Sequence, residues 1–328
     1  MGRCFRAHGL ADTESDRNTR AANISPDKHT SRALAYLLLL LAISFWSGNW
    51  ILGRAMRADV PPIALSFWRW TVALVCLLPW AWRHLCAQRQ ELLRHWRTLL
   101  VLGCFGGACN SATTYIALNM TTATNGVLLA AATPIMIIAL SWALLGKRLQ
   151  AREWLGVLIS LAGVLIIVAH GDPQTLLELR PNKGDLWVLA GFLSWSLYTV
   201  LLSRRPLVLH PYVFLAAISF GGLLALSPFY AWEIASGRTI QANPSTMAAV
   251  AYGGIFVSLL SFVFWNRAVV AVGSNIAGAF MNLMPAVGTL LAIILLGEQP
   301  QLFQLAGILF IVVGLTLTTR QRRGLSAQ

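Results

Sequence analysis

Apolar residues follow one another along most of this chain in runs of about 20, separated by short polar stretches. At a rise of about 1.5 Å per residue, a helix of that length crosses the apolar part of a bilayer. No alternation over segments of about ten residues recurs, as a transmembrane barrel requires. We predict an all-α membrane protein with ten transmembrane helices near residues 33–53, 62–82, 98–118, 124–145, 153–169, 185–203, 211–232, 246–265, 273–296 and 302–319.

The overall composition supports a membrane protein. Of the 328 residues, 57% are hydrophobic and only 11% are charged, against about 25% charged residues in a soluble domain. Two stretches differ from the rest: residues 1–32 are polar and carry both signs of charge, and residues 320–328 are basic. We interpret the first as a disordered cytoplasmic tail and the second as a basic cytoplasmic tail.

The spans form two copies of one pattern. Trp46 and Ser47 recur as Trp195 and Ser196, 149 positions later. Pro62 with Pro211 and Pro79 with Pro228 keep this offset, and an offset of 151 then relates Ala117 to Ala268, Pro134 to Pro285, Gly146 to Gly297, Gly156 to Gly307 and Gly163 to Gly314. A nearly constant offset across consecutive helices indicates an internal repeat. We predict a first five-helix repeat over 33–170 and a second over 184–319.

Lysine and arginine residues concentrate on one side of the predicted spans. With a cytoplasmic N-terminus, 19 of the 25 lie on the cytoplasmic side, five lie on the opposite side, and Arg69 alone lies well inside a span. This bias predicts that both termini are cytoplasmic. Since five is odd, the second repeat crosses the membrane in the opposite sense, so the repeats are inverted. The net charge of +13 is thus explained by the cations that orient the protein in the membrane. We therefore expect no nucleic-acid partner.

Pro134 and Pro285 lie at matching positions inside spans 4 and 9, each followed twelve positions later by a glycine. A proline inside a helix removes one backbone hydrogen bond and bends the helix. Secondary transporters with inverted repeats place interrupted helices in matching positions beside a central site. We therefore predict a gating role for both prolines; the alternative is an ordinary kink that neighbouring helices accommodate.

Ten spans in two copies, with Pro-x11-Gly at the end of one helix and Gly-x6-Gly in the next, resemble the EamA branch of the drug/metabolite transporter superfamily. The resemblance covers residues 33 to 319. Members usually carry Gly-Glu at the ends of spans 4 and 9; Gly297-Glu298 conforms, whereas Gly146-Lys147 departs. Within the family, the pattern is most similar to bacterial exporters of amino acids, including aromatic ones, and of other metabolites. The resemblance implies a multi-pass protein of the bacterial inner membrane.

Aromatic and amide side chains share one face of span 1 and one face of span 6. Trp46 and Asn49 lie one helical turn apart, and Trp195 and Tyr198 repeat that spacing in the second copy. Because the two helices correspond, we expect the four residues to line opposite walls of a substrate-binding pocket. Such walls suit aromatic or aliphatic solutes and ammonium groups. The alternative is that these aromatic residues face lipid or the interfacial belt.

Three further polar residues are candidates for substrate binding. Arg69 is an ionisable group inside a span, which by default indicates function, and it is expected to bind a substrate carboxylate; the alternative is that its side chain extends to the membrane surface. Tyr115 in span 3 and Asn282, one turn before Pro285, are expected to face the cavity. For the amide, a contact between helices is the alternative.

Several kinds of chemistry find no support in the sequence. The five cysteines form no CxxC pair and the six histidines lie in tails, loops or span ends, so we expect no metal, no cofactor and no catalytic residue. No nucleotide-binding G-x-x-x-x-G-K-[ST] loop is present. No Asp or Glu lies in the middle of a span, which leaves proton coupling without an obvious carrier. The expected partners are the lipid bilayer and a small-molecule substrate, and we expect a monomer, with an oligomer left open.

The sequence therefore favours a secondary transporter, an exporter or facilitator of small metabolites. Amino acids, including aromatic ones, are the expected substrates, moved by alternating access through a central cavity. One alternative is transport of phosphorylated or nucleotide-linked solutes, which requires several cations in the cavity. Another is a membrane receptor or scaffold that moves no solute. An intramembrane enzyme would need a clustered catalytic set, which the sequence does not show.

Overall fold

The computed structural model describes residues 31–56, 59–121, 126, 129–172, 174–175, 182–204, 209–296 and 299–319. Within these ranges the regular structure is helical and no strand is present. Residues 1–30 of the first predicted tail, all of the second tail, Gly297-Glu298 and most of the start of predicted span 4 lie outside the described residues. The last two residues of the first tail cap and begin α2. The helices are α2 (Arg32–Ala55), α3 (Pro62–Ala87), α4 (Arg89–Arg94), α5 (Trp96–Gly103), η1 (Cys104–Cys109), α6 (Asn110–Met120), α8 (Thr133–Leu145), α9 (Ala151–Val168), α11 (Lys183–Arg204), α12 (Pro211–Ala235), α13 (Pro244–Tyr252), η2 (Gly253–Leu260), α14 (Ser261–Val272), α15 (Ser274–Phe280), α16 (Leu283–Leu296) and α17 (Leu302–Thr319).

Eight helical stretches among the described residues are long and apolar enough to cross a membrane. They correspond to predicted spans 1, 2, 3, 5, 6, 7, 8 and 10. Spans 3 and 8 are each built from three consecutive segments, α5, η1 and α6 in one copy and α13, η2 and α14 in the other. The helices that correspond to spans 4 and 9 are shorter, so the structure supports a multi-pass, all-helical protein without supplying ten full-length spans.

The prediction that span 9 is one bent helix is wrong. A turn at Met281 and Asn282 separates α15 from α16, and Pro285 is the third residue of α16. In the first copy, Pro134 is likewise the second residue of α8 and follows a turn at 131–132. The first residues of a helix have N–H groups with no partner inside the helix. Proline is therefore tolerated at these positions, and the chain begins a new helix there instead of bending an old one.

Two π-helical segments occupy corresponding places in the two copies. η1 ends at Cys109 and η2 ends at Leu260, which are 151 positions apart, the same offset that relates Ala117 to Ala268. Each packs against a helix of the other copy, η1 against α12 and η2 against α3. A methyl group placed on Gly107 would lie 3.5 Å from the nearest atoms of Gly222 and of the Trp70 ring. The widened turns thus lie where neighbouring helices approach closely.

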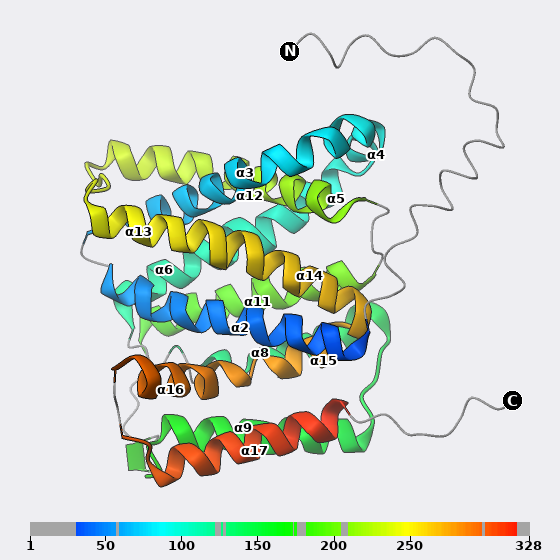
Figure 1. The fold of residues 1–328 in the computed structure, drawn as a ribbon, viewed down its shortest axis with the longest axis vertical. Helices are drawn as coiled ribbons and strands as arrows, with labels where there is room; N and C mark the ends of the chain where they lie inside the picture. Colours follow the sequence, from blue (N-terminus) through cyan, green and yellow to red (C-terminus); the bar gives the residue numbers. More distant parts are fainter. Residues whose placement is uncertain are drawn as a thin grey trace, which may run out of the picture.

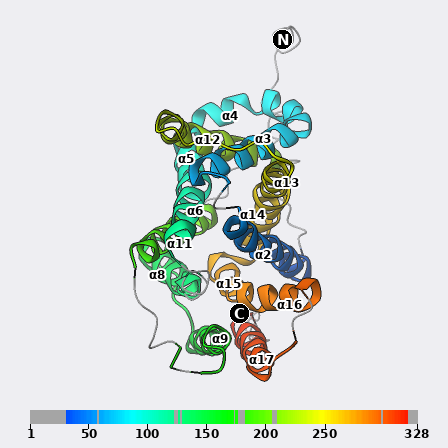
Figure 2. The ribbon, with the colours of Figure 1, turned by 90° about the vertical axis from the view of Figure 1, so that its left-hand side faces the viewer.

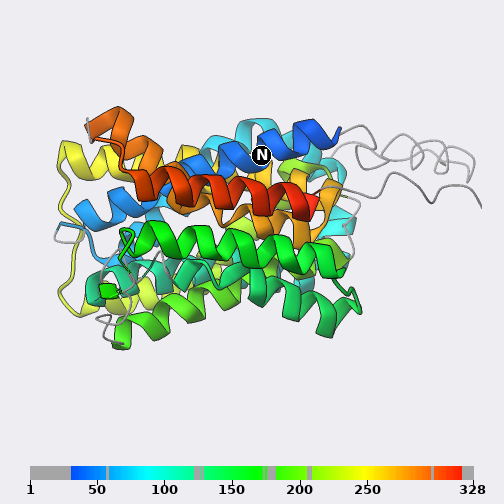
Figure 3. The same cartoon turned by 90° about the horizontal axis from the view of Figure 1, so that it is seen from below.

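Corresponding helices of the two copies pack against one another in opposite directions. In α9, Gly156 faces Gly314 of α17, while Gly163 faces Gly307, so the order along one helix is reversed in the other. Figure 3 shows these two helices side by side. A Cβ on Gly163 would lie 2.5 Å from the carbonyl oxygen of Gly307. The glycines that repeat every seven residues therefore allow two backbones to touch.

The pair formed by α3 and α12 is also antiparallel. At one end, the Glu233 carboxylate of α12 accepts hydrogen bonds from the backbone N–H groups of Ile63 (3.3 Å) and Ala64 (2.7 Å) at the start of α3. At the other end, the side chain of Gln88 accepts from the backbone N–H of His210 (2.9 Å), just before α12 begins. Each helix start is thus capped by a residue from the end of its partner.

Viewed along the helices, the molecule has two rows (Figure 2). One row contains α5, α6, α11 and α8, and the other contains α13, α14, α2 and α16; α3 with α12 close one end of the rows, and α9 with α17 close the other. The start of α2 and the end of α17 lie at the same end of the bundle (Figure 1). The main hydrophobic core, which includes Trp46, Trp195 and Phe262, lies between the rows.

Candidate functional site

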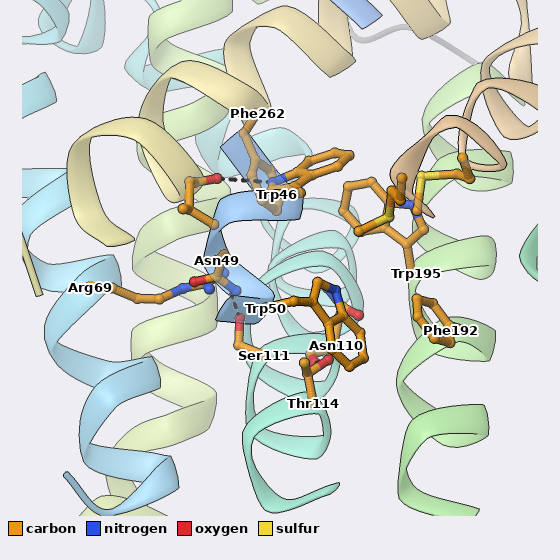
Figure 4. Close-up of a pocket in the computed structure, with 13 residues that line it drawn as sticks. Trp46, Asn49, Trp50, Arg69, Asn110, Ser111, Thr114, Phe192, Trp195 and Phe262 are labelled. Atoms are coloured by element: carbon orange, nitrogen blue, oxygen red, sulfur yellow. Dashed lines mark hydrogen bonds between the residues drawn. The ribbon is translucent and has the colours of Figure 1, made fainter. Parts of the chain in front are cut away.

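A small cavity lies in the middle of the bundle, between the two rows of helices. Its volume is about 50 Å³, enough for a few water molecules and too small for an amino acid. Aromatic, amide and hydroxyl side chains surround it, together with one cation (Figure 4). The lining residues are Trp46, Asn49, Trp50, Arg69, Asn110, Ser111, Thr114, Phe192, Trp195, Val257, Phe262, Met281 and Met284.

One wall of the cavity is an aromatic cluster. The rings of Trp46 and Trp195 meet edge to face with centroids 4.9 Å apart, and Trp265 and Phe262 lie 5.2 and 6.1 Å from Trp46. The Trp46 indole N–H donates to the carbonyl oxygen of Val257 at 3.2 Å, which fixes its orientation. The indole nitrogens of Trp195 and Trp265 are buried without a partner among the described residues. Two polar donors therefore remain within the aromatic cluster.

Arg69 lies opposite, and only 4% of it is exposed. One terminal nitrogen, Nη1, donates to the Tyr115 hydroxyl at 2.9 Å, and the other, Nη2, donates to the Ser111 hydroxyl at 3.0 Å. The Tyr115 hydroxyl in turn donates to Oδ1 of Asn49 at 2.8 Å. Three helices thus hold the guanidinium group against the cavity, and the alternative that it extends to the membrane surface does not describe this structure.

The described hydrogen-bond partners of the guanidinium group are neutral. No carboxylate forms an ion pair with Arg69 among the described residues, and its Nε is buried without a hydrogen-bond partner there. Its central carbon lies 5.5 Å from the centre of the Tyr115 ring and 5.8 Å from that of Trp70. Burying a cation without a counter-charge is costly. An anionic group that enters the cavity would offset that cost.

Three of the predicted site residues lie behind the cavity surface. Tyr115 supports Arg69 and does not line the cavity. Tyr198 is fully buried behind Trp195 and donates to Oδ1 of Asn266 at 2.5 Å. Asn282 is 1% exposed, and neither its amide nitrogen nor its amide oxygen has a partner among the described residues. The other four, Trp46, Asn49, Arg69 and Trp195, line the cavity together.

The helix break beside Pro285 contributes directly to the cavity wall. Met281 precedes the break residue Asn282, Met284 follows it, and both methionines line the cavity. The hydroxyl of Ser47 donates to the carbonyl oxygen of Met284 at 3.2 Å, which links α2 to the start of α16. No described residue near Pro134 lines the cavity. The two prolines correspond in sequence, yet only the second adjoins the cavity in this conformation.

Some cavity residues were not among the predicted site residues. Phe192 precedes Trp195 by one helical turn, and the same helical spacing that pointed to Tyr198 also fits Phe192. Asn110, Ser111 and Thr114 form a polar face at the start of α6, a pattern visible in the sequence. Val257, Phe262, Met281 and Met284 carried no signal, because apolar side chains in a membrane span have the same appearance whether they face a cavity or a neighbouring helix.

Comparisons with known proteins agree with the repeat pattern. A profile of the EamA-like transporter family matches residues 33–169 and 182–320. An uncharacterized transporter of Archaeoglobus fulgidus is 32% identical over 295 residues, which cover 88% of this chain and 98% of the relative. An uncharacterized transporter of Bacillus subtilis is 24% identical, over 85% of this chain and 91% of the relative. A solved crystal structure shares the fold, with a TM-score of 0.70 and 22% identity over 88% of this chain and 97% of the other.

Proposed function

The chain belongs to the EamA-like transporter family, whose profile matches both of its repeats, and on that premise we propose that it transports small metabolites, namely amino acids, including aromatic ones. The coarse function, transport across a membrane, follows from the family and from its relatives. The substrate class is our inference from the cavity. We propose that the solute enters as a zwitterion, with its carboxylate against Arg69 and its remaining groups against the aromatic wall.

The observation that carries the proposal is the buried guanidinium group of Arg69, for which the described residues supply no counter-ion. Arg69 already uses one donor of each terminal nitrogen on neutral hydroxyl groups, and its Nε has no partner within the described part of the chain. A guanidinium group has five N–H donors, so it can bind a carboxylate while keeping these two bonds. A carboxylate is therefore the ligand group whose charge and shape complement this side of the cavity.

The aromatic cluster supports the second half of the proposal. Indole faces attract ammonium groups by cation–π contact worth roughly 0.5 to 2 kcal/mol each, and they stack with aromatic side chains. Aromatic surfaces around the cavity come from Trp46, Trp50, Phe192 and Trp195. The indole N–H of Trp195, which no described residue accepts from, adds a donor for a polar solute atom. An aromatic amino acid would place its carboxylate against Arg69 on one side of the site and its ring against the aromatic wall on the other.

We further propose that the two repeats are inverted in the bacterial inner membrane, with ten membrane segments in total and both termini in the cytoplasm. The antiparallel packing of α9 with α17, and of α3 with α12, supports the inversion. In this scheme, α8 and the pair α15 with α16 are the interrupted segments 4 and 9. The excess of 19 cations over five on the cytoplasmic side supports the orientation.

The small volume of the cavity fits an alternating-access cycle in which this conformation is closed around the site. A cavity of about 50 Å³ must expand before it holds an amino acid. Because Met281 and Met284 flank the break between α15 and α16, a hinge movement there would displace two of the lining side chains at once. We propose that Pro285, and Pro134 in the opposite state, keep these breaks in place as gates.

Transport of phosphorylated or nucleotide-linked solutes fits this cavity less well. Those solutes carry two or more negative charges and are held by several cations. Among the described residues, Arg69 is the one cationic residue that lines the cavity. A single guanidinium group matches the single carboxylate of an amino acid.

The proposal is tested by reconstituting the purified protein in liposomes. Uptake of labelled phenylalanine, alanine and glucose 6-phosphate is measured into vesicles loaded with the same unlabelled solute, with and without a pH gradient. We expect saturable exchange of phenylalanine and none of glucose 6-phosphate. Exchange of the phosphorylated solute alone would overturn the substrate class, and no exchange of any solute, from protein that remains folded, would favour the receptor alternative.

A further inference from the structure

A second cleft lies away from the transport site, on the outer side of α8. Its volume is about 440 Å³, within the usual range for ligand sites. One wall is a face of α8 formed by Ile135, Ile138, Ala139 and Trp142, and the other includes Trp154 of α9. Figure 2 shows α9 beside α8 at the edge of the bundle. The central cavity shares none of these residues.

The cleft is apolar along α8 and basic at the end that adjoins the linker after α8. Ile135 and Trp142 are seven residues apart on one helical face, so the apolar wall is about 10 Å long at 1.5 Å per residue. Lys147 and Arg148 lie in the linker 146–150 directly after α8, are exposed, and line the cleft. Neither forms an ion pair with another described residue. The nearest acid in sequence, Glu153, accepts instead from the backbone N–H of Gln150 at 2.7 Å.

The position of the cleft matches the cytoplasmic edge of the bilayer. The linker between α8 and α9 lies at the same end of the bundle as the start of α2 and the end of α17 (Figure 1), which the charge bias assigns to the cytoplasm. Trp142 and Trp154 are 57% and 39% exposed, and indole rings favour the headgroup level of a membrane. The apolar wall then extends into the hydrocarbon region below two cations.

From this arrangement we infer that the cleft binds an anionic phospholipid of the cytoplasmic leaflet. The phosphate group is held by Lys147 and Arg148, and one acyl chain lies along the α8 face between Trp142 and Trp154. Basic sites between membrane helices on the cytoplasmic side recognise such headgroups by charge. The site is independent of the transported solute, since no lining residue is shared.

The second repeat does not carry the same site. At the positions 151 residues later, the two cations Lys147 and Arg148 are replaced by Glu298 and Gln299, and both tryptophans are replaced by aliphatic residues, Ile293 and Leu305. The corresponding part of the second repeat would lie toward the other leaflet, and it lacks the two cations and the two indole rings. The asymmetry indicates that the basic and aromatic residues serve the cytoplasmic side specifically, because the shared architecture alone does not require them.

The test measures lipid binding to the purified full-length protein by native mass spectrometry. The probes are phosphatidylglycerol, phosphatidylcholine with the same acyl chains, and glycerol 3-phosphate as the headgroup without chains. We expect phosphatidylglycerol to bind about tenfold more tightly than phosphatidylcholine, since each cation near the membrane surface contributes appreciably. Equal affinity for the two lipids would overturn the charge recognition. Competition by glycerol 3-phosphate as strong as that by the whole lipid would show a free phosphate site instead.

Two variants and one control locate the binding. Lys147→Gln with Arg148→Gln should abolish the preference for phosphatidylglycerol, whereas the control Arg94→Gln with Arg97→Gln, which removes two cations beside the exposed Trp96 at the same end of the protein, should keep it. Ala139→Phe should weaken binding of the first phosphatidylglycerol molecule by filling the cleft. Retained preference in the first variant, or unchanged affinity in Ala139→Phe, would contradict the proposed site.

Discussion

Trp46 and Trp195 hold corresponding positions in the two repeats, and their rings meet edge to face with centroids 4.9 Å apart. Corresponding residues of the two repeats therefore meet each other at the cavity wall. Because α2 and α11 each contribute one of these indoles, a movement of one repeat relative to the other changes the contact directly. The cavity thus lies between the two repeats, which is where transporters with inverted repeats hold their solute.

The first prediction concerns topology. Single cysteines that replace Lys183 or Arg238 should react with a membrane-impermeant maleimide in intact cells, and cysteines that replace Arg94 or Arg204 should react only after the membrane is opened. The reason is the excess of cations on the cytoplasmic side. External labelling at position 94 would contradict the inverted arrangement of the repeats.

The second prediction concerns the packing of α9 against α17. A methyl group on Gly156 would meet the Thr318 hydroxyl, and it would lie 2.5 Å from the Gly314 carbonyl oxygen. Backbone atoms cannot move aside easily, so Gly156→Ala should destabilise the protein by about 1 to 3 kcal/mol. Thermal unfolding in detergent measures this loss. The control Gly288→Ala, with no atom within 4 Å of the new methyl group, should leave the melting temperature unchanged or raise it slightly.

The third prediction concerns acid sensitivity where the end of α3 meets the start of α12. The rings of His84 and His210 stack with centroids 3.9 Å apart, and burial, followed by the neighbouring His84, lowers the pKa of His210. A histidine with a lowered pKa is neutral in the folded protein, and its Nδ1 accepts from the Tyr212 N–H at 3.4 Å. The unfolded chain binds a proton below about pH 6.5. Stability from this contact is therefore present above pH 6.5 and is lost as the pH falls below it.

The measurement for this prediction is the melting temperature between pH 7.5 and pH 5.5. The wild type should lose more stability over that range than His210→Gln, which cannot gain the proton. An identical pH dependence in the two proteins would show that the stacked pair does not contribute.

The fourth prediction concerns the helix breaks. Alanine restores an N–H donor and a good helix former, so Pro134→Ala and Pro285→Ala should each favour a continuous helix across the break. We expect slower exchange in liposomes with expression largely retained. Cysteines at positions 46 and 195 should change their accessibility from the two sides of the membrane in opposite directions in the two mutants. Normal exchange and wild-type accessibility would mean that the prolines are accommodated breaks without a gating role.

The sequence predicted the family, the two copies and four residues that line one cavity. Trp46 and Trp195 could be paired because a constant offset relates them. The orientation of Tyr198 could not be predicted. Phe192 and Tyr198 each lie one helical turn from Trp195, so either could line the cavity with it. The hydrogen bond from Tyr198 to Asn266 of α14 turns Tyr198 away, and Phe192 lines the cavity instead. The break at Met281 was missed for a related reason. A proline signals a disturbed helix, but whether the helix bends or restarts depends on neighbours such as Ser47.

In the proposed transport cycle, Arg69 binds the carboxylate of the transported solute. The most direct measurement compares exchange of phenylalanine with exchange of its decarboxylated amine, phenethylamine, in liposomes that contain wild type, Arg69→Gln or the control Arg94→Gln. We predict that Arg69→Gln loses phenylalanine exchange at least about tenfold, as expected for loss of a charged hydrogen-bonded contact, and retains that of phenethylamine, while the control retains both. Equal loss of the two solutes in folded Arg69→Gln protein, or no loss of either, would contradict the account.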